Sequence, residues 1–368
     1  MNRFLYYLVF LNMMAIITTP IPSLLLIGAH GGAIPTMVLG LFTGMLISFF
    51  FLKFFNKFPG RDYTELLKAY TSNYLRVPVT IYFAIVWYLA GTITLVMLTF
   101  LLITFLTPEM SIYLIAISIL ITVAFGVLLK SKSVLFAVEI IVFLVVPIAF
   151  FLFIKLYSSS ELDWDQVRTS LMYSNSVPKY GVFTATLFSF SGIANLIVFN
   201  RYFTKRNTNH LGAVLIIGLF GVFTLVTTYF IPIGLNGFDQ VDRLIFPWTS
   251  AADSVRMKYG IVERAVFLFM LFFVAISFMS ITVHWHVSYK LIQSLIRIDK
   301  LQMRNNNWTP FLTVAVFVAV AIYLTVWLTQ YQLYTYSAYY FNAIPIFIIV
   351  WAVTMFAVKR GHDNEPLA

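Results

Sequence analysis

Long apolar stretches separated by short polar segments run along most of the chain. Each stretch is near 20 residues long, the length that crosses a hydrocarbon core as an α-helix. The hydrophobic pattern predicts ten transmembrane helices, near residues 4–28, 36–56, 76–106, 110–129, 133–156, 180–199, 210–234, 261–288, 308–330 and 340–358.

The composition favours a bilayer over water as the solvent of this chain. Of its 368 residues, 61% are hydrophobic and 10% are charged, whereas a soluble domain carries about 25% charged residues. Only helices and closed barrels satisfy their backbone groups in lipid, and barrel strands alternate polar and apolar residues over about ten positions. The long unbroken runs therefore predict an all-α membrane protein, organised as one transmembrane domain over residues 1–368.

The basic residues predict how the chain is oriented. With the N-terminus inside, 17 of the 24 Lys and Arg residues fall at inner positions and 7 at outer ones. This bias follows the positive-inside rule and predicts that both termini are cytoplasmic. The net charge of +10 is then a topology signal, and no nucleic-acid partner is expected. The inner positions are Arg3 and the segments 53–76, 130–132, 201–206, 290–304 and 359–360.

Three connecting segments have their own character. Residues 59–74 predict a short amphipathic helix on the inner surface, because Asp62 and Glu65 have the spacing of a capping box. Residues 157–179 form a polar outer loop. Residues 235–260 form a longer outer loop that is expected to hold an interfacial helix or a lid.

Helix-breaking residues interrupt the first and the sixth predicted spans. The first contains Thr18, Thr19, Pro20, Ile21, Pro22 and Ser23, and the sixth contains the small and polar run from Ser189 through Ser191 and Gly192 to Asn195. Proline removes a backbone donor and clashes with the preceding turn. Matched breaks at the start of two five-helix halves, about 4–156 and 180–358, are typical of an inverted-repeat transporter site. The alternative is a proline kink and ordinary small-residue packing.

Several other polar groups lie within the predicted spans. Glu139 is a candidate for proton or ion coupling, because an intramembrane carboxylate is costly; the alternative is a buried acid that fixes helix packing. Ser280 and His284 lie one turn apart on one helix face, so His284 is a candidate floor of a polar pocket if Ser280 lines it. Thr92, Thr94 and Ala90 in the third span, and Asn342 in the tenth, are further candidates.

Enzyme chemistry finds little support in the sequence. The chain has no cysteine, which excludes disulfides and thiolate sites. His284 and His286 are two residues apart, so they point to different helix faces and make a poor metal pair. No GxSxG, P-loop or Rossmann motif occurs. We therefore expect neither an enzyme nor a metal site nor a cofactor.

Four features resemble a known family over nearly the full length. They are FFNKFPGRDYTELLKAY (54–70), SFSGIANLIVF (189–199) with its exit RYFTKRN, LIFPW (244–248) followed by GIVER (260–264), and ten spans with almost no tails. Together they resemble the B subunit of the GerA-type spore germinant receptors, within the amino acid/polyamine/organocation permease superfamily.

The resemblance implies a LeuT-type fold of two inverted five-helix repeats with discontinuous helices 1 and 6. It implies a nutrient sensor in the spore inner membrane that binds a germinant such as an amino acid, with a larger A subunit and a lipoprotein C subunit as partners. Many relatives carry an acidic residue where this chain has Ala194, and Thr94 also stands where relatives can be acidic. The pocket implied here is therefore less polar.

Two functions of different kinds follow, with a third, plainer reading. The chain is expected to be a germinant-binding receptor subunit, or alternatively a proton-coupled amino-acid permease that uses Glu139; the plainest reading is a membrane scaffold. The expected ligand-binding residues are Thr18, Thr19, Pro20, Pro22, Ala90, Thr92, Thr94, Ser189, Ser191, Gly192, Asn195, Ser280, His284 and Asn342.

Overall fold

The computed structural model describes residues 3–204, 209–256, 262–296 and 308–364. Apart from an isolated bridge between Arg256 and Arg264, the regular structure in these ranges is helical. The α-helices are α1 (Arg3–Ile16), α2 (Ile21–Ile27), α3 (Ala33–Lys57), α4 (Tyr63–Tyr70), α5 (Asn73–Phe105), α6 (Ile112–Leu128), α7 (Ser131–Tyr157), α8 (Trp164–Leu171), α9 (Tyr180–Ser189), α10 (Leu196–Phe199), α11 (His210–Asn236), α12 (Pro247–Ser254), α13 (Ala265–Leu295), α14 (Thr309–Trp327), α15 (Gln330–Asn342) and α16 (Ile344–Asp363). Short 3₁₀ segments are η1 (Met172–Asn175), η2 (Ser191–Asn195), η3 (Asn200–Tyr202) and η4 (Val241–Arg243).

The long apolar helices indicate a multi-pass membrane protein. Within the described ranges, seven helices are long and apolar enough to cross a bilayer, or nine when each of two bent helix pairs is counted as one span. Helix α6 is apolar but has only 17 residues; it occupies the position of the fourth expected span. The ten-span inverted repeat stays a prediction. The expected start of the eighth span, residue 261, lies outside the described residues.

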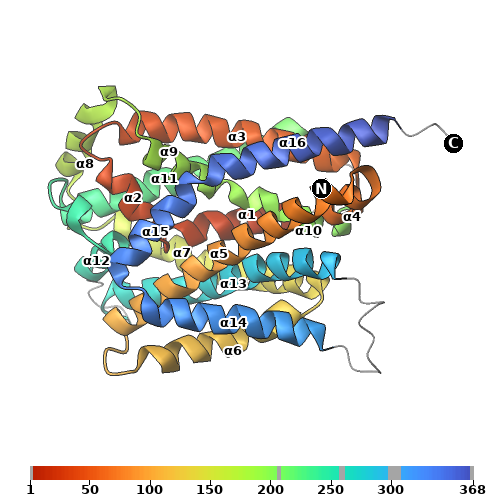
Figure 1. The fold of residues 1–368 in the computed structure, drawn as a ribbon. Helices are drawn as coiled ribbons and strands as arrows, with labels where there is room; N and C mark the ends of the chain where they lie inside the picture. Colours follow the sequence, from red (N-terminus) through yellow and green to blue (C-terminus); the bar gives the residue numbers. More distant parts are fainter. Residues whose placement is uncertain (1–2, 205–208, 257–261, 297–307, 365–368) are drawn as a thin grey trace.

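The spans form an elongated bundle (Figure 1). Helices α3 and α16 run along one side of this view, and α6 and α14 run along the other. Between them, α13 packs against α5, α6 and α7. Both ends of the described chain lie at the same end of the bundle as α4, which we call the termini end, whereas α2, α8 and α12 lie at the opposite end (Figure 1).

The outward-facing side chains are strongly apolar. Phe143 is 78% exposed and Phe125 is 71% exposed, and they are joined by many other exposed Leu, Ile, Val and Phe side chains. Soluble monomers rarely expose contiguous apolar surface of this extent. The exposed surface of the bundle is therefore suited to lipid.

The short helix expected between residues 59 and 74 is present as α4. Its capping box is complete: the Asp62 side chain accepts from the Glu65 backbone N–H at 2.9 Å, and Glu65 accepts from the Asp62 N–H at 3.2 Å. Gly60 precedes it with φ of +77°, a conformation that favours glycine. Its apolar face, with Tyr63, Leu66 and Leu67, is buried, so α4 is held against the termini end of the bundle.

The expected outer loops also contain helices. The 157–179 segment holds α8 and η1, and the 235–260 segment holds α12, where an interfacial helix or a lid was expected. Residues 257–260 of that loop lie outside the described residues, as do the basic positions 205–206, 258, 297, 300 and 304. The shared location of the two chain ends agrees with an even number of crossings, and their cytoplasmic orientation stays a prediction.

Candidate functional site

The first predicted break is present between α1 and α2, whose axes differ by 58°. Pro20 and Pro22 lack the N–H groups that would continue the helical hydrogen bonds to Ile16 and Thr18. The Thr19 hydroxyl instead donates to the Ile16 carbonyl at 2.9 Å. The Thr18 hydroxyl donates to the Ala15 carbonyl at 2.5 Å and lies 3.2 Å from the Ser277 hydroxyl of α13. Local hydroxyls thus hold the interrupted turn.

The second predicted break separates α9 from the η2–η3 segment, with a bend of 49°. Its freed carbonyls are bound by Asn12 of α1, which the sequence analysis did not single out. The Asn12 Nδ2 donates to the Phe188 and Ser189 carbonyls, at 3.1 Å each, and its Oδ1 accepts from the Ser191 hydroxyl at 3.4 Å. Asn12 is only 3% exposed. One buried amide therefore joins the first helix to the break in the sixth.

Close packing at this break explains why Gly192 and Asn195 occupy their positions. A Cβ added to Gly192 would lie 2.8 Å from the Asn12 Cβ and 2.9 Å from the Leu8 carbonyl oxygen, so Gly192 lets α1 and η2 touch. Asn195 donates to the Gly192 carbonyl at 3.1 Å and accepts from the Trp87 indole N–H at 2.8 Å. Trp87 thereby ties α5 to the same break. Gly192 and Asn195 act here through packing and bonding between helices.

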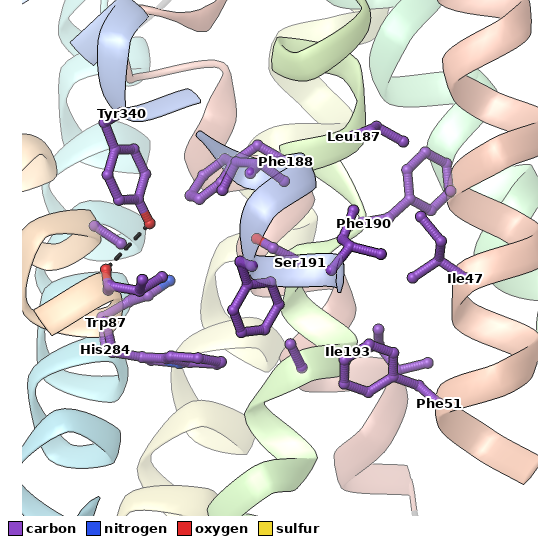
Figure 2. A pocket seen from close by; sticks show the side chains of 17 residues that line it. Ile47, Phe51, Trp87, Leu187, Phe188, Phe190, Ser191, Ile193, His284 and Tyr340 are labelled. Atoms are coloured by element: carbon purple, nitrogen blue, oxygen red, sulfur yellow. Dashed lines mark hydrogen bonds between the residues drawn. The ribbon is translucent and has the colours of Figure 1, made fainter. Parts of the chain in front are cut away.

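A cavity of about 40 Å³ lies beside the break (Figure 2). Its wall comes from α3, α5, α9, η2, α13, α15 and α16. At about 10–15 Å³ per water, a cavity of this size has room for roughly three water molecules. Aromatic rings make up much of the wall, namely Phe51, Trp87, Phe188, Phe190, Tyr340 and Phe347.

Three of the predicted ligand-binding residues line this cavity: Ala90, Ser191 and His284. The His284 Nδ1 lies 2.7 Å from the Ser280 carbonyl oxygen. A carbonyl only accepts, so Nδ1 carries the proton and Nε2 is the acceptor of the neutral ring. Ser280 thus orients His284, which is buried at the cavity wall (Figure 2).

Most of the other polar atoms near the cavity already form hydrogen bonds within the protein. The Tyr340 hydroxyl donates to the Val86 carbonyl at 3.1 Å (Figure 2). Ala194 also lines the wall. The cavity is consequently apolar apart from the Ser191 hydroxyl and the His284 ring.

The other predicted residues lie on different faces. Thr94 donates within its own helix to the Ala90 carbonyl at 3.1 Å, and Thr92 to the Tyr88 carbonyl at 2.8 Å. Thr92 faces a surface groove between α5, α14 and α15. Asn342 accepts from the Thr184 hydroxyl at 2.9 Å and joins α15 to α9. Thr18, Thr19, Pro20, Pro22 and Ser189 lie at or beside the breaks, where their part in ligand binding stays a prediction.

Glu139 lies at the termini end of α7 in an ion pair. Its Oε1 is 2.8 Å from the Arg3 Nε, and its Oε2 accepts from the Arg3 Nη2 at 2.9 Å. The bidentate pair joins the start of α1 to α7. A role in holding these two helices together is enough to explain why a carboxylate lies at this position. Coupling through Glu139 stays a prediction.

Sequence reasoning missed the residues that matter most to this geometry: Asn12, Trp87 and Tyr340. A single asparagine within an apolar span is a signal that could have found Asn12, because a buried amide in lipid needs partners. Trp87 and Tyr340 could not be told from lipid-facing or interfacial aromatics. Which of these rings faces inward follows only from the packing.

Within the described residues, no group of three His, Asp or Glu side chains is placed to hold a metal ion. His286 is already bonded, with Nδ1 2.8 Å from the Val127 carbonyl oxygen and Nε2 2.8 Å from the Ser131 hydroxyl. Its role is to join α13 to the turn between α6 and α7.

A comparison with models of protein families identifies the family to which the chain belongs. The model of the family described as spore germination protein matches residues 6–332, nearly the whole chain. No curated protein matches the chain. The family match agrees with the resemblance to the B subunits of GerA-type receptors, whose motifs lie at α4, at the η2 break and at α12. On this evidence the chain is a member of the spore germination protein family.

Proposed function

We propose that this protein is the germinant-sensing membrane subunit of a spore germinant receptor. The observation that carries the proposal is the cavity beside the η2 break, with His284 and Ser191 as its polar groups. A mostly apolar wall with few placed polar groups is typical of small-molecule sites. The ligand favoured by this wall is a small, largely apolar molecule with a hydrogen-bond donor for His284, such as an apolar amino acid.

The small size of the cavity supports sensing through a conformational equilibrium. A volume of about 40 Å³ is too small for an amino acid, so the described conformation is a closed state. A ligand that fits only an expanded cavity shifts the population toward that state by its differential affinity. The two bent helices are suited to such a change, because the first contacts the break of the second through the few hydrogen bonds of Asn12, and that second break lines the cavity.

The proposal extends to the fold, partners and location. The two breaks fit a LeuT-type repeat of two five-helix halves, residues 4–156 and 180–358. A receptor of this kind would work in the spore inner membrane with a larger A subunit and a lipoprotein C subunit. A partner subunit would then recognise the expanded state through the surface that the two proteins share in the membrane.

The test fills the cavity without touching the helix breaks. Ala90→Phe, on the unbroken helix α5, adds a ring to the wall, and spores whose only germinant receptor contains this variant should lose the nutrient response found for the parent chain. The matched control is Ala319→Phe on the exposed face of α14, which should respond normally. Both variants are compared at equal protein levels in the spore membrane. A normal response of Ala90→Phe spores would contradict ligand binding in this cavity.

The same protein tests the transport alternative. Purified chain in liposomes should bind the nutrient that triggers the response without concentrating it under a proton gradient. Accumulation of the labelled nutrient that depends on the gradient and on Glu139 would instead favour a proton-coupled permease.

A further inference from the structure

A second and larger hollow opens at the termini end of the bundle. It has a volume of about 580 Å³, which is within the range of small-molecule sites, roughly 300–1,000 Å³. Its wall combines α4 and the start of α5 with the start of α7, the η3 segment and the end of α13. Six cationic side chains from these elements line it: Lys68, Arg76, Lys130, Lys132, Arg201 and Lys290. We call it the basic hollow.

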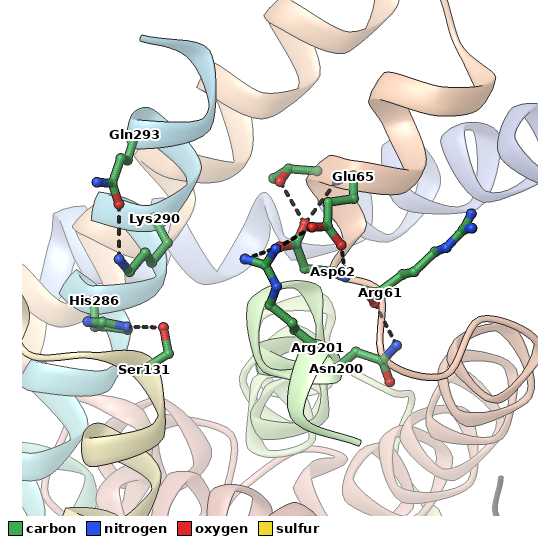
Figure 3. Close-up of polar contacts among 10 residues, drawn as sticks. Arg61, Asp62, Glu65, Ser131, Asn200, Arg201, His286, Lys290 and Gln293 are labelled. Carbon is green, nitrogen blue, oxygen red and sulfur yellow. Dashed lines mark hydrogen bonds and ion pairs between the residues drawn. The ribbon is translucent and has the colours of Figure 1, made fainter. Parts of the chain in front are cut away.

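The two carboxylates in the wall are already engaged (Figure 3). Arg201 lies 2.5 Å from the Glu65 Oε1 and 3.8 Å from the Asp62 Oδ2. Asp62 also accepts from the Thr64 hydroxyl at 2.7 Å as the cap of α4. Both acids pair with Arg201 and hold α4, and two carboxylates against six cations leave the wall with an excess of four positive charges.

Within the described residues, Lys290 has a neutral partner and the Arg76 Nε has none. The Lys290 Nζ donates to the Gln293 Oε1 at 2.9 Å (Figure 3). The Arg76 Nε is buried and has no hydrogen-bond partner within the described part of the chain. Elsewhere at this end cations do meet carboxylates: Lys57 lies 2.6 Å from Asp363, and Arg3 pairs with Glu139.

The positive-inside rule explains why basic residues lie at this end of the bundle, but it does not explain why their side chains converge on one hollow. Positive-inside orientation needs cations in the loops and sets no requirement on where their side chains point. Like charges gathered around one space repel one another unless an anion lies between them. The convergence of five chain segments with one orphaned guanidinium N–H thus points to a ligand.

From this geometry we infer that the basic hollow binds a phosphate-bearing anion. Lysine ammonium groups and the arginine fork are the usual donors to phosphate oxygens. Thr64, Gln293 and Ser294 also line the hollow and suit the hydroxyl groups of a glycerol or sugar phosphate. This chemistry belongs equally to the headgroup of an anionic lipid and to a soluble phosphate. The site is separate from the small cavity and does not depend on nutrient binding there.

The experiment measures thermal stability of the purified full-length chain in a zwitterionic detergent. The probes are inorganic phosphate, pyrophosphate and glycerol 3-phosphate, with sodium chloride at matched ionic strength, and phosphatidylglycerol compared with phosphatidylcholine. A phosphate-bearing probe should raise the melting temperature beyond its matched comparison. A rise with the soluble probes assigns the site to a soluble phosphate, and a rise with phosphatidylglycerol alone assigns it to a lipid headgroup.

Variants show whether the effect comes from the hollow. Lys130→Gln with Lys290→Gln removes two cations of the wall, and the probe should bind about tenfold more weakly for each charge-assisted hydrogen bond lost. Arg61→Gln is the matched control, because the Arg61 side chain points away from Arg201 (Figure 3) and donates to the Tyr70 hydroxyl at 3.2 Å. It should bind like the parent. Should the double variant fold poorly, the exposed Lys130 alone is replaced, and the same comparison holds.

Three results would overturn the inference. One is a melting temperature that rises no further with any phosphate-bearing probe than with its matched comparison. Another is an equal response of the parent, the Arg61 variant and the lysine variants. The third is stabilisation by an acidic peptide such as polyglutamate but by no phosphate, which would assign the hollow to a protein partner.

Discussion

Replacing Asn12 with alanine tests whether one amide holds the two interrupted helices together. The change removes both hydrogen bonds from Nδ2, to the carbonyls of Phe188 and Ser189 at 3.1 Å. It leaves these carbonyls without their side-chain donor inside a bundle with little water. We expect the variant to fold with a lower stability and with a looser break between α9 and η2.

The magnitude follows from the number of bonds lost. Hydrogen bonds between membrane helices contribute about 0.6 kcal/mol each on average and up to about 1.7, and an unpaired buried acceptor costs about 1–3 kcal/mol. For the two bonds to the carbonyls, with the longer bond from the Ser191 hydroxyl at 3.4 Å adding little, the free energy of unfolding should fall by about 2 kcal/mol, which is roughly a thirtyfold change in the folding equilibrium. The melting temperature should fall by a few degrees.

Thermal unfolding in a mild detergent, followed by tryptophan fluorescence, measures this loss. The control is Asn73→Ala, because Asn73 is exposed at the start of α5 and its replacement should change stability by less than about 0.5 kcal/mol. Equal melting temperatures for the Asn12 variant, the Asn73 variant and the parent would refute the reasoning. The freed carbonyls would then be satisfied without Asn12.

Three further changes probe the neighbouring contacts. Gly192→Ala should lower stability by about 1–3 kcal/mol through overpacking against α1, and an unchanged melting temperature would mean that α1 can move aside freely. Asp62→Ala removes the cap of α4 and should lower stability by about 1 kcal/mol, with faster proteolysis after residues 61–68; protection like that of the parent would contradict a role for the cap. The Glu139→Gln variant should be expressed normally and should slow the nutrient response. Its free energy of unfolding should fall by at most about 1 kcal/mol, because Arg3 is largely exposed. A response and a pH dependence identical to the parent would remove Glu139 from the mechanism.

Local chemistry made several features predictable. The capping box of Asp62 and Glu65 involves residues three positions apart, so its outcome depends little on the rest of the fold. The prolines at positions 20 and 22 forbid regular helical bonds wherever the chain is placed. The first break therefore occurs where it was expected, and the second occurs at the expected small and polar run from Ser189 to Asn195.

The lining of the cavity was less predictable. Ala90, Ser191 and His284 were expected in the pocket and line the cavity, whereas Thr92 and Thr94 bond within their own helix. Periodicity places a residue on a helix face but does not say which neighbour that face meets. In a membrane this is especially limiting, because lipid and protein interior are both apolar and the pattern does not separate them.

By itself, the sequence determined most of the apolar spans and the positions of both breaks, because each of these depends on nearby residues and on the solvent. The tertiary structure alone decided that Asn12 binds the carbonyls of the second break, that Trp87 and Tyr340 turn inward, and that six cations from five segments surround one hollow. These are contacts between residues far apart in the chain. Their partners are chosen by helix packing, whose geometry no local pattern records.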